Sequence, residues 1–158
     1  MARWLVVAHQ TGDSPALVAT VRELSKADPR AEFVVLTPRR PITMTMVLGG
    51  ESRSSTQIAI WRARRTTQRL KAAGAAVVST RLGSFDPLQA IEDQLESDHF
   101  SGVVISTLPH GLSTWLRLDL PAKVKQRWPE LDVIHVTAPS AWFRKDDINL
   151  ATKAGTGR

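Results

Sequence analysis

Apolar and polar positions alternate along the chain in blocks that predict a parallel α/β sheet. Short apolar runs, typical of strands buried on both faces, predict strands at residues 4–8, 33–36, 75–79, 102–106 and 132–137. Between these runs, apolar residues recur at spacings of three and four, which indicates amphipathic helices. Because five strands alternate with four helices, we expect one doubly wound, Rossmann-like parallel sheet with helices on both faces. Right-handed crossovers restrict the topology, and we expect the strand order 3-2-1-4-5.

Capping residues mark where the expected helices begin and end. Ser14 and Asp86 are suitable N-caps because each precedes a proline that can occupy the first helical position. Asp119 is expected to cap the last helix with its carboxylate. Residues 52–73 are expected to form a long helix that ends before Gly74, with its arginines outside the buried face. That face is expected to consist of Ala59, Ala63, Thr66, Leu70 and Ala73.

The length of the chain, 158 residues, indicates a single domain. We expect residues 1–139 to form the α/β domain and residues 140–158 to form a polar, flexible C-terminal tail. Residues 38–51 form a long connection after the second strand. A connection of this length is typical of a lid or a contact surface, and a mobile loop is an equally good interpretation.

Composition excludes several classes of site. The chain has no cysteine, so disulfides and thiolate metal sites are excluded. Its four histidines are scattered, and we expect no bound metal and no cofactor. The apolar run near the N-terminus is too short for a signal peptide or a membrane span. We therefore expect a cytoplasmic protein that has no membrane partner.

The net charge of +6 raises the question of a nucleic-acid partner. The basic residues, among them Arg39, Arg40, Lys123, Lys125 and Arg127, are spread along the chain instead of forming one stripe. Acidic residues are interleaved with them in several helices. We therefore expect a solvated surface and no nucleic acid. A basic nucleic-acid binder remains a third hypothesis, which predicts a steep salt dependence of binding.

The carboxyl ends of the first and fourth strands are where we expect a ligand, because the strand order reverses there. The candidate ligand-binding residues are His9, Gln10, Thr11, Gly12, Thr107, His110, Gly111 and Ser113. Ordinary turn residues that satisfy backbone groups are the alternative interpretation. His9 and His110 could form an acid–base pair only if their rings meet across the crevice, and we expect no catalytic residue.

The layout, and above all the segment from Ser106 to Val124, resembles the universal stress protein family. The most specific part is STLPHGLSTWLRLDLPAKV, followed by the strand DVIHVTA, and the resemblance covers residues 2–138. It implies a small α/β domain of a kind that often dimerises, in a family of which many members bind ATP. The chain is most similar to a divergent branch, because the glycine-rich ATP-binding signature is missing.

Members that bind ATP carry three spaced glycines and a hydroxyl residue at the end of the fourth strand. Aligned on this chain, the glycine positions fall at Ile105, Leu108 and Leu118, and the hydroxyl position falls at Asp119. The family's acidic residue after the first strand falls near His9 and is absent. Glycines let the backbone approach a phosphate closely. We therefore expect Leu108 and Leu118 to plug the crevice, and Asp119 to place a negative charge where a phosphate would sit.

Two functional hypotheses follow from these observations. The first is a regulatory or protective domain of universal stress protein type, non-enzymatic, which does not bind ATP in the usual manner of the family. It would act through an unknown small ligand or a protein partner. The alternative is a nucleotide-binding or nucleotide-hydrolysing protein, with ATP or AMP held in a rebuilt site at the ends of strands one and four.

Several apolar residues have no obvious place in the core and indicate a contact surface. They are Met44, Met46, Ile58, Trp61, Trp115 and Trp142. A homodimer would cover some of them. The resemblance implies that the fifth strand, Asp132 to Thr137, pairs with its mate, which would also remove an exposed sheet edge. Alternatively, the long connection folds back and buries these groups within one subunit.

Overall fold

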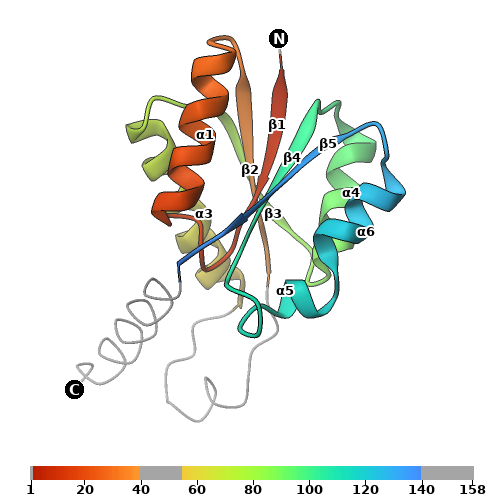
Figure 1. Ribbon diagram of the computed structural model, residues 1–158. Helices are drawn as coiled ribbons and strands as arrows, with labels where there is room; N and C mark the ends of the chain where they lie inside the picture. The colour runs from red at the N-terminus through yellow and green to blue at the C-terminus, as the bar shows by residue number, and fades with distance from the viewer. Residues whose placement is uncertain (1, 40–54, 140–158) are drawn as a thin grey trace, which may run out of the picture.

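The computed structural model describes residues 2–39 and 55–139 and places them in one five-stranded sheet between helices (Figure 1). The elements in chain order are β1 (Arg3–Val7), α1 (Pro15–Ala27), β2 (Glu32–Pro38), α3 (Ser55–Ala72), β3 (Ala76–Gly83), α4 (Pro87–Ser97), β4 (Gly102–Thr107), α5 (Thr114–Arg117), α6 (Leu120–Arg127) and β5 (Asp132–Thr137). All neighbouring strands are parallel, in the order β3-β2-β1-β4-β5. The predicted fold class and strand order are confirmed. The expected tail at 140–158 and residues 40–51 of the long connection lie outside the described residues.

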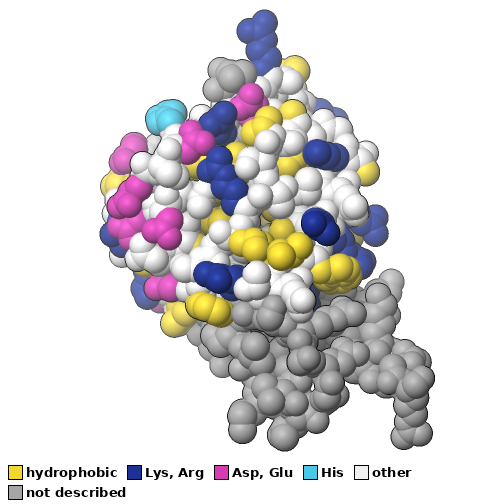
Figure 2. Space-filling view, turned by 180° about the vertical axis from the view of Figure 1, so that it is seen from behind, with side chains coloured by type: hydrophobic (Ala, Val, Ile, Leu, Met, Phe, Trp, Pro, Cys, Tyr) yellow, Lys and Arg dark blue, Asp and Glu magenta, His cyan; other side chains and the backbone are white. Residues whose placement is uncertain are grey.

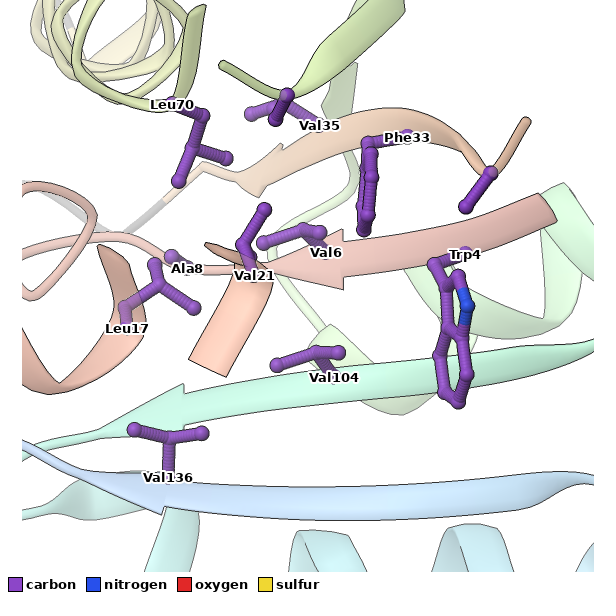
Figure 3. Packing of buried hydrophobic residues seen from close by; sticks show 12 residues of the cluster. Trp4, Val6, Ala8, Leu17, Val21, Phe33, Val35, Leu70, Val104 and Val136 are labelled. Carbon is purple, nitrogen blue, oxygen red and sulfur yellow. The ribbon is translucent and has the colours of Figure 1, made fainter. Parts of the chain in front are cut away.

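One hydrophobic cluster on each face of the sheet holds the layers together. Helices α1 and α3 cover one face, and α4 and α6 cover the other (Figure 1). Figure 3 shows the first cluster, in which Leu17 and Val21 of α1 and Leu70 of α3 point toward strand residues such as Val6 and Phe33. Each of these five side chains is fully buried. Burying one such side chain contributes about 1.5–3 kcal/mol. The second cluster includes Leu5, Ile91, Ile105, Trp115, Leu120 and Val124.

Two of the three predicted helix caps are confirmed. The Ser14 hydroxyl accepts a hydrogen bond from the backbone N–H of Leu17 at 3.3 Å. The Asp86 carboxylate accepts one from the N–H of Leu88 at 3.0 Å. Because Ser14 begins α1 directly after the loop that follows β1, this cap also fixes the end of that loop.

Strand β3 extends beyond the apolar run at 75–79, and this part of the prediction is wrong. The strand continues to Gly83, so the turn expected from Gly83 to Phe85 begins one residue later. β3 is the edge of the sheet, and the burial of its side chains alternates along the strand. A half-exposed strand needs no continuous apolar run, which is why the pattern indicated only its first half.

Helix α3 buries four of the five residues of the predicted face and one residue that was not predicted. Ala73, the fifth, lies just beyond the helix and is half-buried. Ala59, Ala63, Thr66 and Leu70 are buried, as expected. Arg62 is also buried, with 7% of its surface exposed, although the arginines were expected to lie outside this face. Residue 62 lies three or four positions from 59 and 66, so it shares their side of the helix.

The apolar residues with no expected place in the core differ in their burial, and Ile58 is half-buried. Trp115 is 9% exposed and packs in the second cluster, so the expectation that it lacks a place in the core is wrong. The short helix α5, which the sequence pattern did not predict, directs this ring inward. Trp61, in contrast, is 43% exposed, as expected of a surface residue. Met44, Met46 and Trp142 lie outside the described residues.

The surface shown in Figure 2 carries no continuous basic stripe. Lys and Arg side chains alternate there with hydrophobic and neutral ones, and the Asp and Glu side chains gather toward one side. On this face of the described residues, positive charge is therefore not concentrated in one place.

Candidate functional site

The carboxyl ends of the two central strands, β1 and β4, meet at one edge of the sheet. Val7 of β1 lies in register with Ile105 of β4, so the loops that follow these strands begin side by side. A hydrogen bond of 2.7 Å between the hydroxyls of Thr11 and Ser106 joins the loop that follows β1 to the end of strand β4. Both residues are buried, so this bond fixes the position of the loop against the sheet.

A pocket opens at this junction, and we call it the β1–β4 pocket. It is lined by His9, Gln10, Thr11, Ser106, Thr107, Leu108, Ser113 and Trp115. The space between these residues, open solvent included, is about 300 Å³. Five of the eight candidate residues line it. Gly12 lines an adjacent pocket that shares His9 and Gln10.

His110 and Gly111 do not line either pocket. Both are exposed in the turn after β4, where Gly111 has a φ of 92° and the N–H groups of Leu112 and Ser113 bond to the carbonyl of Pro109. A left-handed residue in a tight turn favours glycine, which explains why this glycine is here. The ring of His9 is buried while His110 faces solvent, so the acid–base pair considered for them has no geometric support.

Three residues that line the β1–β4 pocket were not among the candidate ligand-binding residues predicted from the sequence. Ser106 is a polar residue within an apolar strand, and this break in the pattern could have indicated it. Leu108 was expected to fill the crevice, and it does lie at the pocket wall, 8% exposed. Trp115 had no local signal, because its place depends on how α5 packs against the sheet.

The other residue expected to plug the crevice, Leu118, does not do so. Its side chain is 50% exposed and it lines neither pocket. Asp119 adopts the left-handed conformation with φ of 52°, and its side chain makes no capping hydrogen bond to α6. The predicted cap is therefore wrong. Helix α5 ends just before these residues, and the sharp turn into α6 directs both side chains outward.

The hydroxyl of Thr107 is held by two neighbours. It donates to the carbonyl of Leu108 at 2.9 Å, and it lies 2.8 Å from Nε2 of His135 on β5. Because the hydroxyl has one hydrogen, His135 must donate to it. Burial and the positive charge of Lys125 lower the pKa of His135, which favours its neutral form. Strand β5 thus positions a residue that lines the β1–β4 pocket.

The chemistry of this pocket is that of hydrogen bonding and apolar contact. Its lining offers three hydroxyl residues besides Thr107, an imidazole and an amide, with Leu108 and Trp115 as apolar walls. Among the described residues that line it there is no carboxylate, Lys or Arg. Among the described residues, no group of three or more His, Asp or Glu side chains could hold a metal ion.

Solved structures with the same arrangement of elements are universal stress proteins. One, crystallised in complex with cAMP, is 20% identical, with 87% of this chain and 98% of that chain covered and a TM-score of 0.56. A family member from Arabidopsis thaliana with AMP bound is 10% identical, with 89% and 94% covered and a TM-score of 0.60. A protein from Archaeoglobus fulgidus is 15% identical, with 86% and 93% covered and a TM-score of 0.57.

The chain has the universal stress protein fold. The resemblance noted in the sequence is therefore confirmed at the level of the fold, which is what likeness at these identities establishes. No protein-family model matches the sequence, and no curated protein matches it. Among the helices of the described residues, none is both long and apolar enough to cross a membrane.

Proposed function

We propose that this domain is a non-enzymatic regulatory module that binds an adenosine-type nucleotide in the β1–β4 pocket. Two proteins of the same fold hold cAMP and AMP, which favours a nucleotide over other small molecules. The observation that carries the proposal is the lining itself. Hydrogen-bonding side chains stand beside Leu108 and Trp115, and this mixture suits a base and a ribose.

The same lining argues against a triphosphate held in the manner of the glycine-rich signature. Ile105, at the first glycine position, is fully buried in the core, and Leu108, at the second, forms the pocket wall. Side chains at both positions keep a phosphate from the backbone N–H groups. A triphosphate also needs positive charge, and none of the described residues that line the β1–β4 pocket is Lys or Arg. The proposal therefore combines the rebuilt site of the alternative hypothesis with the loss of the family's usual mode of ATP binding from the first hypothesis.

A regulatory role without catalysis is consistent with the residues at the pocket. A general base must be positioned against the proton that it takes, and none of the described residues that line this pocket is a carboxylate. The hydroxyls of Thr11, Ser106 and Thr107 are engaged with one another or with neighbours. Such groups orient a ligand instead of attacking it.

Calorimetric titration with adenosine, AMP and ATP tests the proposal. We expect saturable binding of adenosine and AMP, and binding of ATP no tighter than that of AMP. Gln10→Ala should weaken all three by between about twofold and about tenfold, because it removes one hydrogen bond. Gln89→Ala, which changes an exposed glutamine on α4, is the matched control.

Three outcomes would contradict this proposal. The first is that neither adenosine nor AMP shows saturable binding at millimolar concentration. The second is that ATP binds at least about tenfold tighter than AMP. The third is that phosphate is released from ATP in proportion to protein concentration.

The proposal includes a homodimer through β5. Among the described residues, β5 pairs only with β4, so its other edge is open to a second copy. Pairing would cover backbone groups that otherwise invite aggregation. Light scattering should give a dimer mass, and amide exchange at residues 132–137 should slow as protein concentration rises. A monomer mass, or a dimer whose amides in this range stay unprotected, would refute it.

A further inference from the structure

Thr107 is the last residue of β4, and strand β5 holds both its backbone and its side chain. Strand β5 runs beside β4 (Figure 1), with Thr107 in register with Thr137. The carbonyl of Thr107 accepts a hydrogen bond from the N–H of Ala138 at 2.9 Å, and its hydroxyl lies 2.8 Å from Nε2 of His135. A residue held in this way presents a fixed set of hydrogen-bonding groups to the β1–β4 pocket, which it lines.

The hydroxyl of Thr107 has no hydrogen left for a ligand. A threonine hydroxyl carries one hydrogen and two acceptor lone pairs. Its hydrogen is donated to the carbonyl of Leu108 at 2.9 Å, and Nε2 of His135 donates to one lone pair. The second lone pair remains. Toward a ligand in the pocket, this hydroxyl is therefore an acceptor only.

The other hydroxyls of the pocket are not restricted in this way. The Ser113 hydroxyl accepts from the N–H of Leu116 at 3.2 Å, and the structure gives its hydrogen no acceptor among the described residues, so it can donate to a ligand. Between Thr11 and Ser106, either hydroxyl can be the donor. The direction of a hydrogen bond to a ligand is therefore fixed at Thr107 and adjustable at these three residues.

Burial makes a mismatched group at Thr107 costly. Thr107 is 2% exposed and Leu108 is 8% exposed, so a seated ligand leaves water little access to the remaining lone pair. A ligand acceptor placed against it would leave two acceptors facing each other with no hydrogen between them. An apolar group would leave the lone pair unpaired. Either mismatch is expected to weaken binding by about tenfold.

We infer that Thr107 is the specificity-determining residue of the β1–β4 pocket, where it accepts a hydrogen bond from a donor group of the ligand. His135 is the positioning residue that keeps Thr107 in this state. The inference rests on the proposed function, which makes the ligand an adenosine-type nucleotide. Outside its phosphate, such a ligand carries two kinds of donor, the 6-amino group of the base and the hydroxyls of the ribose. Both are hydrogen-bond donors that match the lone pair of Thr107.

Calorimetric titration of adenosine and three analogues distinguishes the two sources. Inosine has a carbonyl in place of the 6-amino group, and 2′-deoxyadenosine and 3′-deoxyadenosine each lack one ribose hydroxyl. We expect at least one analogue to bind the unaltered chain about tenfold weaker than adenosine. Thr107→Val, which removes the hydroxyl and keeps a branched side chain, should bring that analogue within about twofold of adenosine. Thr80→Val, the same substitution on β3 and outside this pocket, is the matched control and should leave the difference unchanged.

Two variants test the positioning role of His135. His135→Leu removes the donor, so the Thr107 hydroxyl is freer to turn its hydrogen toward a ligand, and the difference between adenosine and the weaker analogue should shrink. His135→Gln, whose amide can still donate, should retain more of that difference. The ratio of two affinities is insensitive to a general loss of stability. Equal ratios in the two variants would show that His135 does not act on Thr107 through a donated hydrogen bond.

The unaltered chain tests the inference by itself, should a variant not fold. If all three analogues bind as tightly as adenosine, no donor of the ligand is selected, and the inference is wrong while the proposed function stands. The same conclusion follows if an analogue binds weakly and Thr107→Val leaves its disadvantage intact. If neither adenosine nor any analogue binds, the proposed function fails, and the inference fails with it.

Discussion

Replacing Gly102 with alanine is expected to destabilise the protein by about 3 kcal/mol, the upper end of the usual cost of overpacking a core. A Cβ atom on residue 102 would stand 2.3 Å from Cζ3 of Trp4 and 2.6 Å from the carbonyl oxygen of Asp132. Figure 3 shows the Trp4 ring reaching from β1 across β4. The oxygen belongs to the backbone of β5, so it moves only if the sheet moves. Urea unfolding followed by tryptophan fluorescence measures the loss.

Two further variants separate the causes of this loss. Trp4→Leu alone removes buried ring atoms and is destabilising, but in combination with Gly102→Ala it should recover part of the added cost. Recovery stays partial because the contact with the Asp132 carbonyl remains. Gly74→Ala, where a Cβ meets nothing within 4 Å but φ is 92°, reports the cost of backbone strain alone. If Gly102→Ala costs no more than Gly74→Ala, the close packing described for β1, β4 and β5 is wrong.

Replacing Gly12 with alanine is expected to cost about 2 kcal/mol, because the new methyl group would overlap the side chain of Thr66. The obstacle here is a side chain on α3, not backbone. Thr66→Ala in the same chain should therefore restore more than half of the stability. Thr66→Ala alone should cost about 1 kcal/mol or less, since its hydroxyl donates only to a carbonyl within the helix. Thermal unfolding of the four chains gives the coupling free energy.

The Gly12 cycle also tests the contact between α3 and the loop that follows β1, because Gly12 and Thr66 are the two residues that meet there. Additive stability costs, with no coupling between residues 12 and 66, would show that the loop and the helix are not in contact in solution.

The caps and strands illustrate which parts of the fold are encoded locally. Ser14 and Asp86 cap their helices as predicted, because an N-cap needs only its own side chain and the next three residues. Asp119 is an aspartate directly before a helix, as Asp86 is, yet its side chain makes no capping hydrogen bond. Its backbone is left-handed, and that conformation comes from the packing of α5 and α6, which lies beyond the range of a local pattern.

The candidate site shows the same division. His9, Gln10, Thr11, Thr107 and Ser113 line the β1–β4 pocket, since they lie next to the ends of the two central strands. His110 and Gly111 are equally close in sequence but turn toward solvent. In a loop, the direction of a side chain follows from turn geometry and neighbouring elements, so proximity in sequence identified the region and not the individual residues.

By itself, the sequence determined the parallel α/β class, the five strands, the central position of β1 and β4 and the end of the sheet where a site belongs. These follow from hydrophobic periodicity, which is local, and from the few topologies that right-handed crossovers allow. Only the tertiary structure decided that Trp115 is core, that Leu118 faces solvent and that Arg62 is buried beside the loop after β1. Each of these depends on packing between segments that are distant in sequence.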